Sequence, residues 1–285
     1  MFNSKLFAIV LLLGSVTAFV PFEDGMQYEF RFKSKLNLSP IFLTGQSVNA
    51  TLLVRNFGTD GSSLVVRIKD SEAEGKNVNS ETKGVVEGVF GVKRNRTGTI
   101  THIISKSNSA KEVLTKKNIV GMLSDDFSFF DNYVRHASSR KRQQRVELSL
   151  GPCDSDISAE IDENNGLINV LAQSQLGKCD VNQLTMKVGQ LLLQGTTKPI
   201  ARTGDDSNIG MSVMYDIKTK QMLEVNKFTF LNLEVLGIEV QARHNMILEY
   251  VGKHPVTSET NFGTPYFAFS NDDIDEFVRE QEEKE

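Results

Sequence analysis

The two cysteines of this 285-residue chain, Cys153 and Cys179, could form a disulfide. Strand-like segments lead into both: residues 146–150 precede Cys153, and residues 166–171 precede Cys179. The sequence between these segments, Asp-Glu-Asn-Asn-Gly at 162–166, is typical of a turn. A hairpin built on this turn would allow a bridge between the cysteines, provided that the chain folds in an oxidising compartment.

The first residues predict that compartment. Lys5 precedes an apolar run, Leu6–Leu13, and the small-residue sequence Val16-Thr17-Ala18 follows it. This order is typical of a cleavable signal peptide, here residues 1–18, and predicts a chain in the lumen of the endoplasmic reticulum or secreted from the cell. No later stretch has the apolar length of a transmembrane segment, so none is expected. We therefore expect Cys153 and Cys179 to pair, the alternative being two free thiols.

Three acceptor sequences for N-glycosylation agree with a secretory route. They begin at Asn37, Asn49 and Asn95, each followed two residues later by Ser or Thr. Asn37 is the weakest of the three, because Pro40 directly follows its sequence.

The residues expected of an enzyme do not form a recognisable motif. The four histidines have no metal-site spacing, and the carboxylate pairs, such as Asp125 with Asp126, lie in polar segments typical of solvated caps. We therefore predict a binding protein, not an enzyme, with no catalytic residue, metal site or cofactor, and no particular lipid-binding residue stands out. The net charge of −4 also argues against a nucleic-acid partner.

A basic run is the strongest charge feature of the chain. It comprises Arg140, Lys141, Arg142 and Arg145. An exposed loop would explain it, and so would a surface that docks an acidic partner. A dibasic processing site is a third interpretation, and all three remain open from the sequence.

Most of the chain shows the two-residue period of half-buried strands. The alternation starts at Met26–Phe32, forms a hairpin from 48–54 and 64–68, and returns in Ile100, His102 and Ile104 and across Met211–Val251, where Leu223, Val225, Phe228 and Phe230 provide the apolar positions. These strands have few breaks, which favours an up-and-down sheet or barrel over a sandwich of short strands.

One segment has a helical pattern instead. In residues 109–123, Ser109 and Glu112 form a capping pair, and Ala110, Val113, Leu114, Val120 and Leu123 recur near the helical period. An amphipathic helix lying on a sheet is the simplest interpretation.

Together these features resemble the amino-terminal barrel of the large lipid transfer proteins, the superfamily of vitellogenin, apolipoprotein B and the large subunits of microsomal triglyceride transfer proteins, with the last branch nearest. The resemblance rests on Gly25–Tyr28, Leu52–Asn56, Leu64–Asp70, the helix at 109–123, the cysteine pair and the strands from Tyr215 to Tyr250.

The resemblance implies a mainly β fold, an antiparallel β-barrel of residues 19–258 wrapped around one central α-helix at 109–123. Residues 259–285 would form an acidic tail, at the place where the family's helical domain begins. The family implies lipid transport during lipoprotein assembly, with triglyceride or phospholipid as lipid and with an apolipoprotein B-like lipoprotein and protein disulfide isomerase as partners. The alternative is an interaction module that keeps the docking surface without lipid transfer, because a helix inside the barrel leaves little room for lipid.

Overall fold

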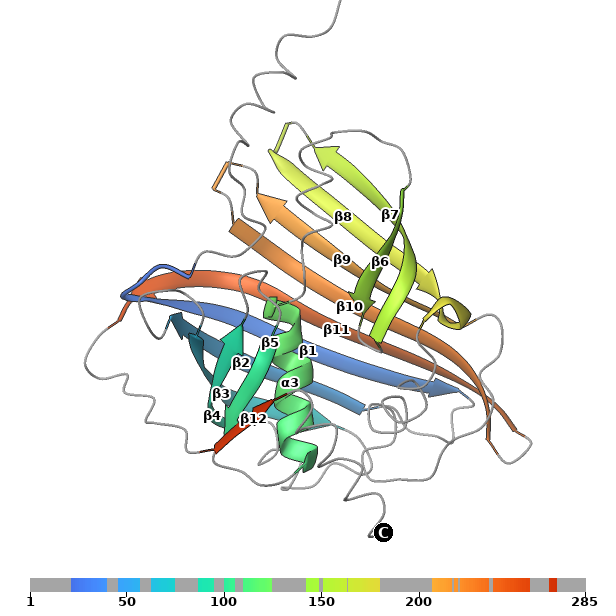
Figure 1. The fold of residues 1–285 in the computed structure, drawn as a ribbon, viewed down its shortest axis with the longest axis horizontal. Helices are drawn as coiled ribbons and strands as arrows, with labels where there is room; N and C mark the ends of the chain where they lie inside the picture. Colours follow the sequence, from blue (N-terminus) through green and yellow to red (C-terminus); the bar gives the residue numbers. More distant parts are fainter. Residues whose placement is uncertain are drawn as a thin grey trace, which may run out of the picture.

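The computed structural model describes most of the chain between residues 22 and 270 (Figure 1). The described ranges are 22–39, 46–56, 63–74, 87–94, 100–105, 110–124, 142–148, 151–162, 164–179, 207–216, 218–219, 221–235, 238–256 and 267–270. The expected signal peptide, residues 1–18, and Asn95, Arg140 and Lys141 lie outside them.

In the described ranges, twelve antiparallel strands form one sheet. The first five are β1 (Met26–Ser39), β2 (Gln46–Asn56), β3 (Ser63–Glu74), β4 (Gly88–Arg94) and β5 (Ile100–Ser105). After the helix α3 (Ala110–Ser124) come β6 (Arg142–Leu148), β7 (Gly151–Asp162), β8 (Leu167–Gln175), the 3-10 turn η1 (Leu176–Lys178), β9 (Asn208–Asp216), β10 (Gln221–Val235), β11 (Ile238–Pro255) and β12 (Phe267–Ser270).

The strand order shows two meanders joined along a single seam. The order is β12-β5-β4-β3-β2-β1-β11-β10-β9-β8-β7-β6, so β1 to β5 form an amino-terminal meander and β6 to β11 a carboxyl-terminal one. The seam is the pairing of β1 with β11, which runs from Met26 opposite Pro255 to Ser39 opposite Gln241. Within each meander, strands that follow one another in the sequence pair antiparallel, which confirms the expected up-and-down arrangement.

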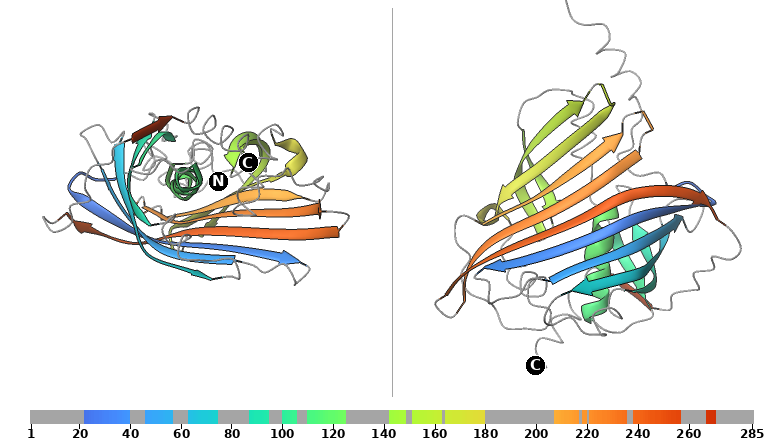
Figure 2. Two further views of the ribbon diagram at one scale, coloured as in Figure 1. Left: turned by 90° about the horizontal axis from the view of Figure 1, so that it is seen from below. Right: turned by 180° about the vertical axis from the view of Figure 1, so that it is seen from behind.

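The helix α3 connects the two meanders and lies inside the curve of the sheet (Figure 2). Its observed bounds differ by one residue at each end from those expected. Among the helix side chains whose burial is described, the buried apolar ones are Ile119, Val120, Met122 and Leu123. The predicted mainly β fold around one helix is confirmed for the part of the chain that the structure describes.

The sheet does not close into a complete barrel across the described strands. Its two edges are β12 and β6, and these do not pair with each other. Closure needs every strand to have two neighbours. The architecture is therefore an open, strongly curved sheet around a helix.

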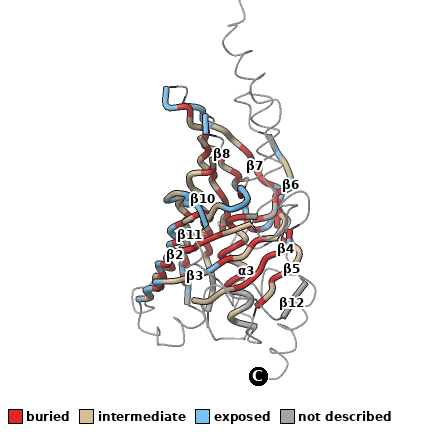
Figure 3. Tube along the Cα trace, turned by 90° about the vertical axis from the view of Figure 1, so that its left-hand side faces the viewer, coloured by how far each residue is buried: buried red, intermediate tan, exposed pale blue. Residues whose placement is uncertain are grey.

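The concave face of the sheet holds the core, so buried and exposed residues alternate along the strands (Figure 3). In β1 the side chains of Tyr28, Phe30 and Phe32 are buried, as the sequence predicts. Phe22 packs edge-on against Tyr28, with the ring centres 5.0 Å apart. Aromatic packing of this kind adds to the stability that burial alone provides.

The predicted alternation fails at β5. Ile100 is buried, but the next buried residues are Ile103 and Ser105, not His102 and Ile104. The register shifts here, because Lys93 pairs with His102 whereas Arg94 pairs with Ile100, which leaves Thr101 as an extra residue. Thr101 fills this bulge by donating its hydroxyl to the Lys93 carbonyl, at 3.3 Å.

The expected acidic tail also contains a strand. Residues 267–270 form β12, which pairs with β5 from Phe267 opposite Ser105 to Ser270 opposite His102. The remaining residues of that segment, 259–266 and 271–285, lie outside the described ranges.

Candidate functional site

The cysteine pair lies where the sequence places it. Cys153 in β7 and Cys179 after η1 are both buried and form a disulfide. The turn between their strands is stabilised by Asp162, whose carboxylate accepts hydrogen bonds from the backbone amides of Asn164 and Asn165. Gly166 completes the turn with a φ of +71°, a conformation that favours glycine. The predicted disulfide across a hairpin is confirmed.

Polar side chains interrupt the concave face where the two meanders meet. Ser34 of β1, Thr229 of β10 and His244 of β11 lie among buried apolar residues, and Thr229 is directly opposite His244. The His244 ring nitrogen Nε2 and the Ser34 hydroxyl are hydrogen-bonded at 2.9 Å. Burial lowers the pKa of the His244 imidazole to about 4, so the ring is neutral at pH 7.

A buried lysine lies beside these groups. Lys227 lies two residues before Thr229 in β10, on the same face and opposite Met246. Its Nζ donates to the carbonyl of Gly121 in α3, at 3.4 Å. The last carbonyls of a helix lack partners within the helix and carry partial negative charge. α3 has no basic residue in its own last turn, so the strand supplies a cation there.

A second buried lysine lies on the helix itself. Lys116 forms an ion pair with Glu112 one turn earlier and donates to the Ser105 hydroxyl of β5, at 3.4 Å. Its ammonium also lies 5.5 Å from the centre of the Phe90 ring. A carboxylate, a hydroxyl and a π-face together compensate the cost of burying this charge.

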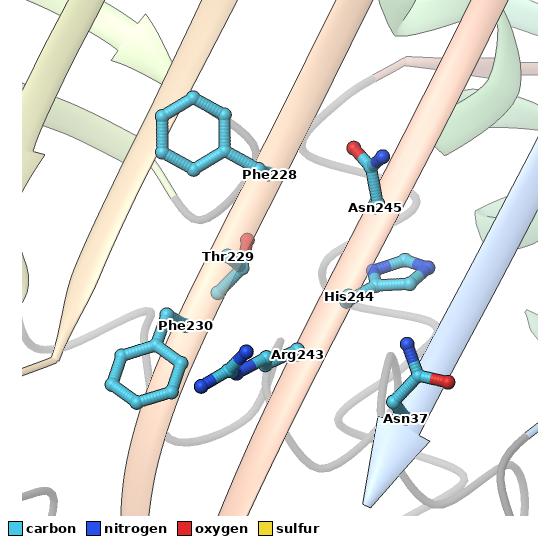
Figure 4. Close-up of a pocket in the computed structure, with 7 residues that line it drawn as sticks. All are labelled: Asn37, Phe228, Thr229, Phe230, Arg243, His244 and Asn245. Carbon is cyan, nitrogen blue, oxygen red and sulfur yellow. The ribbon is translucent and has the colours of Figure 1, made fainter.

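A groove of about 490 Å³ crosses β1, β11 and β10 at the position of Thr229 and His244. Figure 4 shows the residues that line it: Asn37, Phe228, Thr229, Phe230, Arg243, His244 and Asn245. Phe228 pairs with Asn245 across the strands, Phe230 pairs with Arg243, and Arg243 also pairs with Asn37. Because side chains alternate along a strand, these five residues share the convex face, opposite to Thr229 and His244.

The convex part of the groove combines aromatic rings with polar groups. The Arg243 guanidinium lies 5.2 Å from the centre of the Phe230 ring. The Phe228 ring lies over Gly210 of β9, where a Cβ atom would be 2.2 Å from Cζ of Phe228. The side-chain oxygen of Asn245 is buried and accepts no hydrogen bond within the described ranges. Rings, amides and a guanidinium can bind a ligand that has both an apolar face and polar edges.

The sequence pattern does not predict this groove, because it counts Phe228 and Phe230 among the apolar positions of a half-buried strand. The structure corrects this: Val225, Lys227, Thr229 and Leu231 are buried on the concave face, and the two phenylalanines are half-buried on the convex one. Val225 is the residue from which this arrangement could have been predicted. If Val225 faces the core, strict alternation places Lys227 and Thr229 on the same, concave face.

The predicted docking residues are only partly visible. Arg142 begins the edge strand β6, and Arg145 of the same strand is exposed and forms an ion pair with Asp154, at 3.4 Å. Arg140 and Lys141 lie outside the described ranges. Among the expected glycosylation sites, Asn37 and Asn49 are exposed on the convex face of β1 and β2.

The described ranges contain no group of three or more His, Cys, Asp or Glu side chains that could hold a metal ion. Within the same ranges, no helix combines the length and the apolar character needed to cross a membrane.

No family model and no curated protein matches this chain. A solved structure does: a study of lipid–protein interactions in lipovitellin describes a chain that superposes with a TM-score of 0.56 at 10% sequence identity. The match covers 86% of this chain and 28% of the lipovitellin chain. The chain therefore has the fold of part of lipovitellin, which supports the expected resemblance at the level of the fold.

A second structure, a DUF1329 family protein from Desulfovibrio piger, matches with a TM-score of 0.21 at 10% identity, over 90% of this chain and 93% of that one. This score is too low to support a shared fold.

Proposed function

We propose that this protein acts in lipid transport as a member of the large lipid transfer proteins and assists lipoprotein assembly in the secretory pathway. The observation that carries the proposal is the curved antiparallel sheet around α3, which superposes on part of lipovitellin over 86% of this chain. The motifs that resemble the microsomal triglyceride transfer protein branch support that branch as the nearest. The signal-like residues 1–18 support residence in the endoplasmic reticulum lumen or secretion.

The curved sheet would contribute by docking a partner protein. The position of β6 supports this role, because it is an edge of the sheet among the described strands, and edge strands are common sites of strand addition by a partner. Its Arg142 and Arg145 belong to the basic run, which would favour an acidic segment of the partner. The family suggests an apolipoprotein B-like lipoprotein as this partner and protein disulfide isomerase as a companion.

A second candidate is an interaction module without lipid transfer. The observation in its favour is the filling of the concave face: α3 buries Ile119, Val120, Met122 and Leu123 there. A lipid inside the sheet would have to displace these side chains or lie elsewhere.

Lipid analysis separates the two functions. The full chain would be expressed through a secretory pathway, purified gently and extracted for mass spectrometry beside a mock purification. Stoichiometric triglyceride or phospholipid supports transport by this chain. A folded, lipid-free protein supports the interaction module.

Docking is tested by the double variant Arg142→Glu/Arg145→Glu. We expect it to lose binding to an immobilised acidic segment of an apolipoprotein B-like protein, because like charges would then face each other. Arg67→Glu is the matched control, since Arg67 is an exposed arginine of β3. Equal binding by both variants would remove β6 as the docking edge.

A further inference from the structure

We infer that the groove on the convex face is the seat of an N-linked glycan carried by Asn37, whose first sugars lie on Phe230 and Phe228. The inference rests on the proposed secretory route, because only there would Asn37 be glycosylated. It goes beyond the proposed function, because it names what binds in the groove.

The position of Asn37 carries the first step. Asn37 is an exposed residue of β1 that lines the groove, and it begins an Asn-Leu-Ser acceptor sequence. Its cross-strand partner is Arg243, which also lines the groove. A sugar attached to the Asn37 amide therefore starts at the rim of the groove (Figure 4).

The chemistry of the lining carries the second step. An N-acetylglucosamine has one face of C–H groups and edges of hydroxyl and amide groups. The half-buried rings of Phe228 and Phe230 offer apolar faces, and the Arg243 guanidinium is already held 5.2 Å from the Phe230 ring centre. Arg243 can donate to sugar hydroxyls, and Asn245 presents an amide at the same place.

The size of the groove is consistent with this occupant. Its volume of about 490 Å³ lies within the usual range of small-molecule sites, roughly 300–1,000 Å³. Asn49 provides a natural contrast, because it is also exposed on the convex face, in β2, and is not among the residues that line the groove.

The test compares the two sites in the full chain made by a glycosylating secretory host. Ser39→Ala removes the acceptor sequence at Asn37 and leaves the asparagine in place, and Thr51→Ala does the same for Asn49. We expect Ser39→Ala to lower Tm by about 2–4 °C, whereas Thr51→Ala leaves Tm within about 1 °C. In a Phe230→Leu background the effect of Ser39→Ala should vanish.

A second measurement does not depend on stability. Under native conditions, an amidase that cleaves N-glycans should release the Asn37 glycan about tenfold more slowly than the Asn49 glycan, since the linkage sugar is held in the groove. Denaturation or Phe230→Leu should remove this difference.

The outcomes distinguish the two proposals. If Asn49 carries a glycan and Asn37 does not, or if the two sites behave alike, the groove does not bind the Asn37 glycan. Neither result contradicts the secretory route. An uncleaved signal peptide together with no glycan at any site would contradict the secretory route, and with it the binding of an Asn37 glycan in the groove.

Discussion

The two meanders of the sheet are stabilised by different means. The amino-terminal meander and the segment before it bury aromatic side chains, with Phe30, Tyr28 and Phe90 almost inaccessible to solvent. The carboxyl-terminal meander has a disulfide at its outer end and buries Lys227, Thr229 and His244 next to the seam. Apolar packing is fixed by the strand period, whereas buried polar groups need partners from other elements. The comparison predicts that the two meanders respond differently to mutation, reduction and pH.

The largest effect is expected from Phe30→Ala in the aromatic meander. Phe30 is fully buried, and its ring centre lies 5.7 Å from that of Tyr250 across the seam. The lost contacts and the cavity should lower the free energy of unfolding by about 3–5 kcal/mol. Urea unfolding measures this, with Phe228→Ala on the convex face as the control. Equal losses would show that the two faces of the sheet are packed alike.

The disulfide comes next. Cys153 and Cys179 have a sequence separation of 26, and opening a loop of that length should cost about 3–4 kcal/mol in the chain-entropy model. Cys153→Ser should therefore lower stability by this amount and expose Cys179 to alkylation without a reductant. Reductant should destabilise the parent protein and leave the variant unchanged. A parent insensitive to reductant would show that the bridge does not limit unfolding.

The third prediction concerns His244 and pH. Burial lowers the pKa of the folded-state imidazole from 6.5 to about 4, so between these values the unfolded chain binds more protons than the folded one. The contribution of neutral His244 to the free energy of unfolding is fully present above about pH 6.5. It is lost as the pH drops towards 4, by about 3 kcal/mol in total. Unfolding measured from pH 7 to pH 4 should show this slope, and His244→Gln should flatten it. The half-exposed His102 is the control, and His102→Gln should keep the slope.

The smallest effect is expected at Lys227. Lys227→Met keeps most of the side-chain volume and removes the cation from the Gly121 carbonyl, which should lower stability by about 1 kcal/mol. Lys35→Met, at an exposed site of β1, should be neutral. A stabilised Lys227→Met would indicate that the cost of burying the charge exceeds its interaction with the helix end.

Sequence patterns predicted the regular parts of this molecule well. The alternation in Met26–Phe32, the helical spacing in 109–123 and the turn at 162–166 are local signals, and each corresponds to an observed element. The cysteine pair followed from the expected compartment and the same turn.

The remaining features depend on contacts that no local pattern records. Thr101 forms a bulge whose hydroxyl bonds to a neighbouring strand, so His102 and Ile104 turn away from the core. Alternation from Val225 places Lys227 inside, but its hydrogen-bond partner, the carbonyl of Gly121 in α3, is 106 residues away in sequence, and no local pattern reveals it. The same alternation places Phe228 and Phe230 on the convex face, where they line the groove. The expected docking role of Arg140, Lys141, Arg142 and Arg145 stays a prediction.

The seam between β1 and β11 has a consequence for how the chain folds as it is synthesised. Arg31 and Glu249, which form an ion pair across it, are 218 residues apart. During translation β1 therefore leaves the ribosome long before its partner, and the amino-terminal meander carries an open strand edge until β11 emerges. Pairings this distant in sequence make folding slow, and exposed edges attract other chains. The edge of β1 is therefore the part of the amino-terminal meander that we expect to be open to wrong pairing until β11 is available.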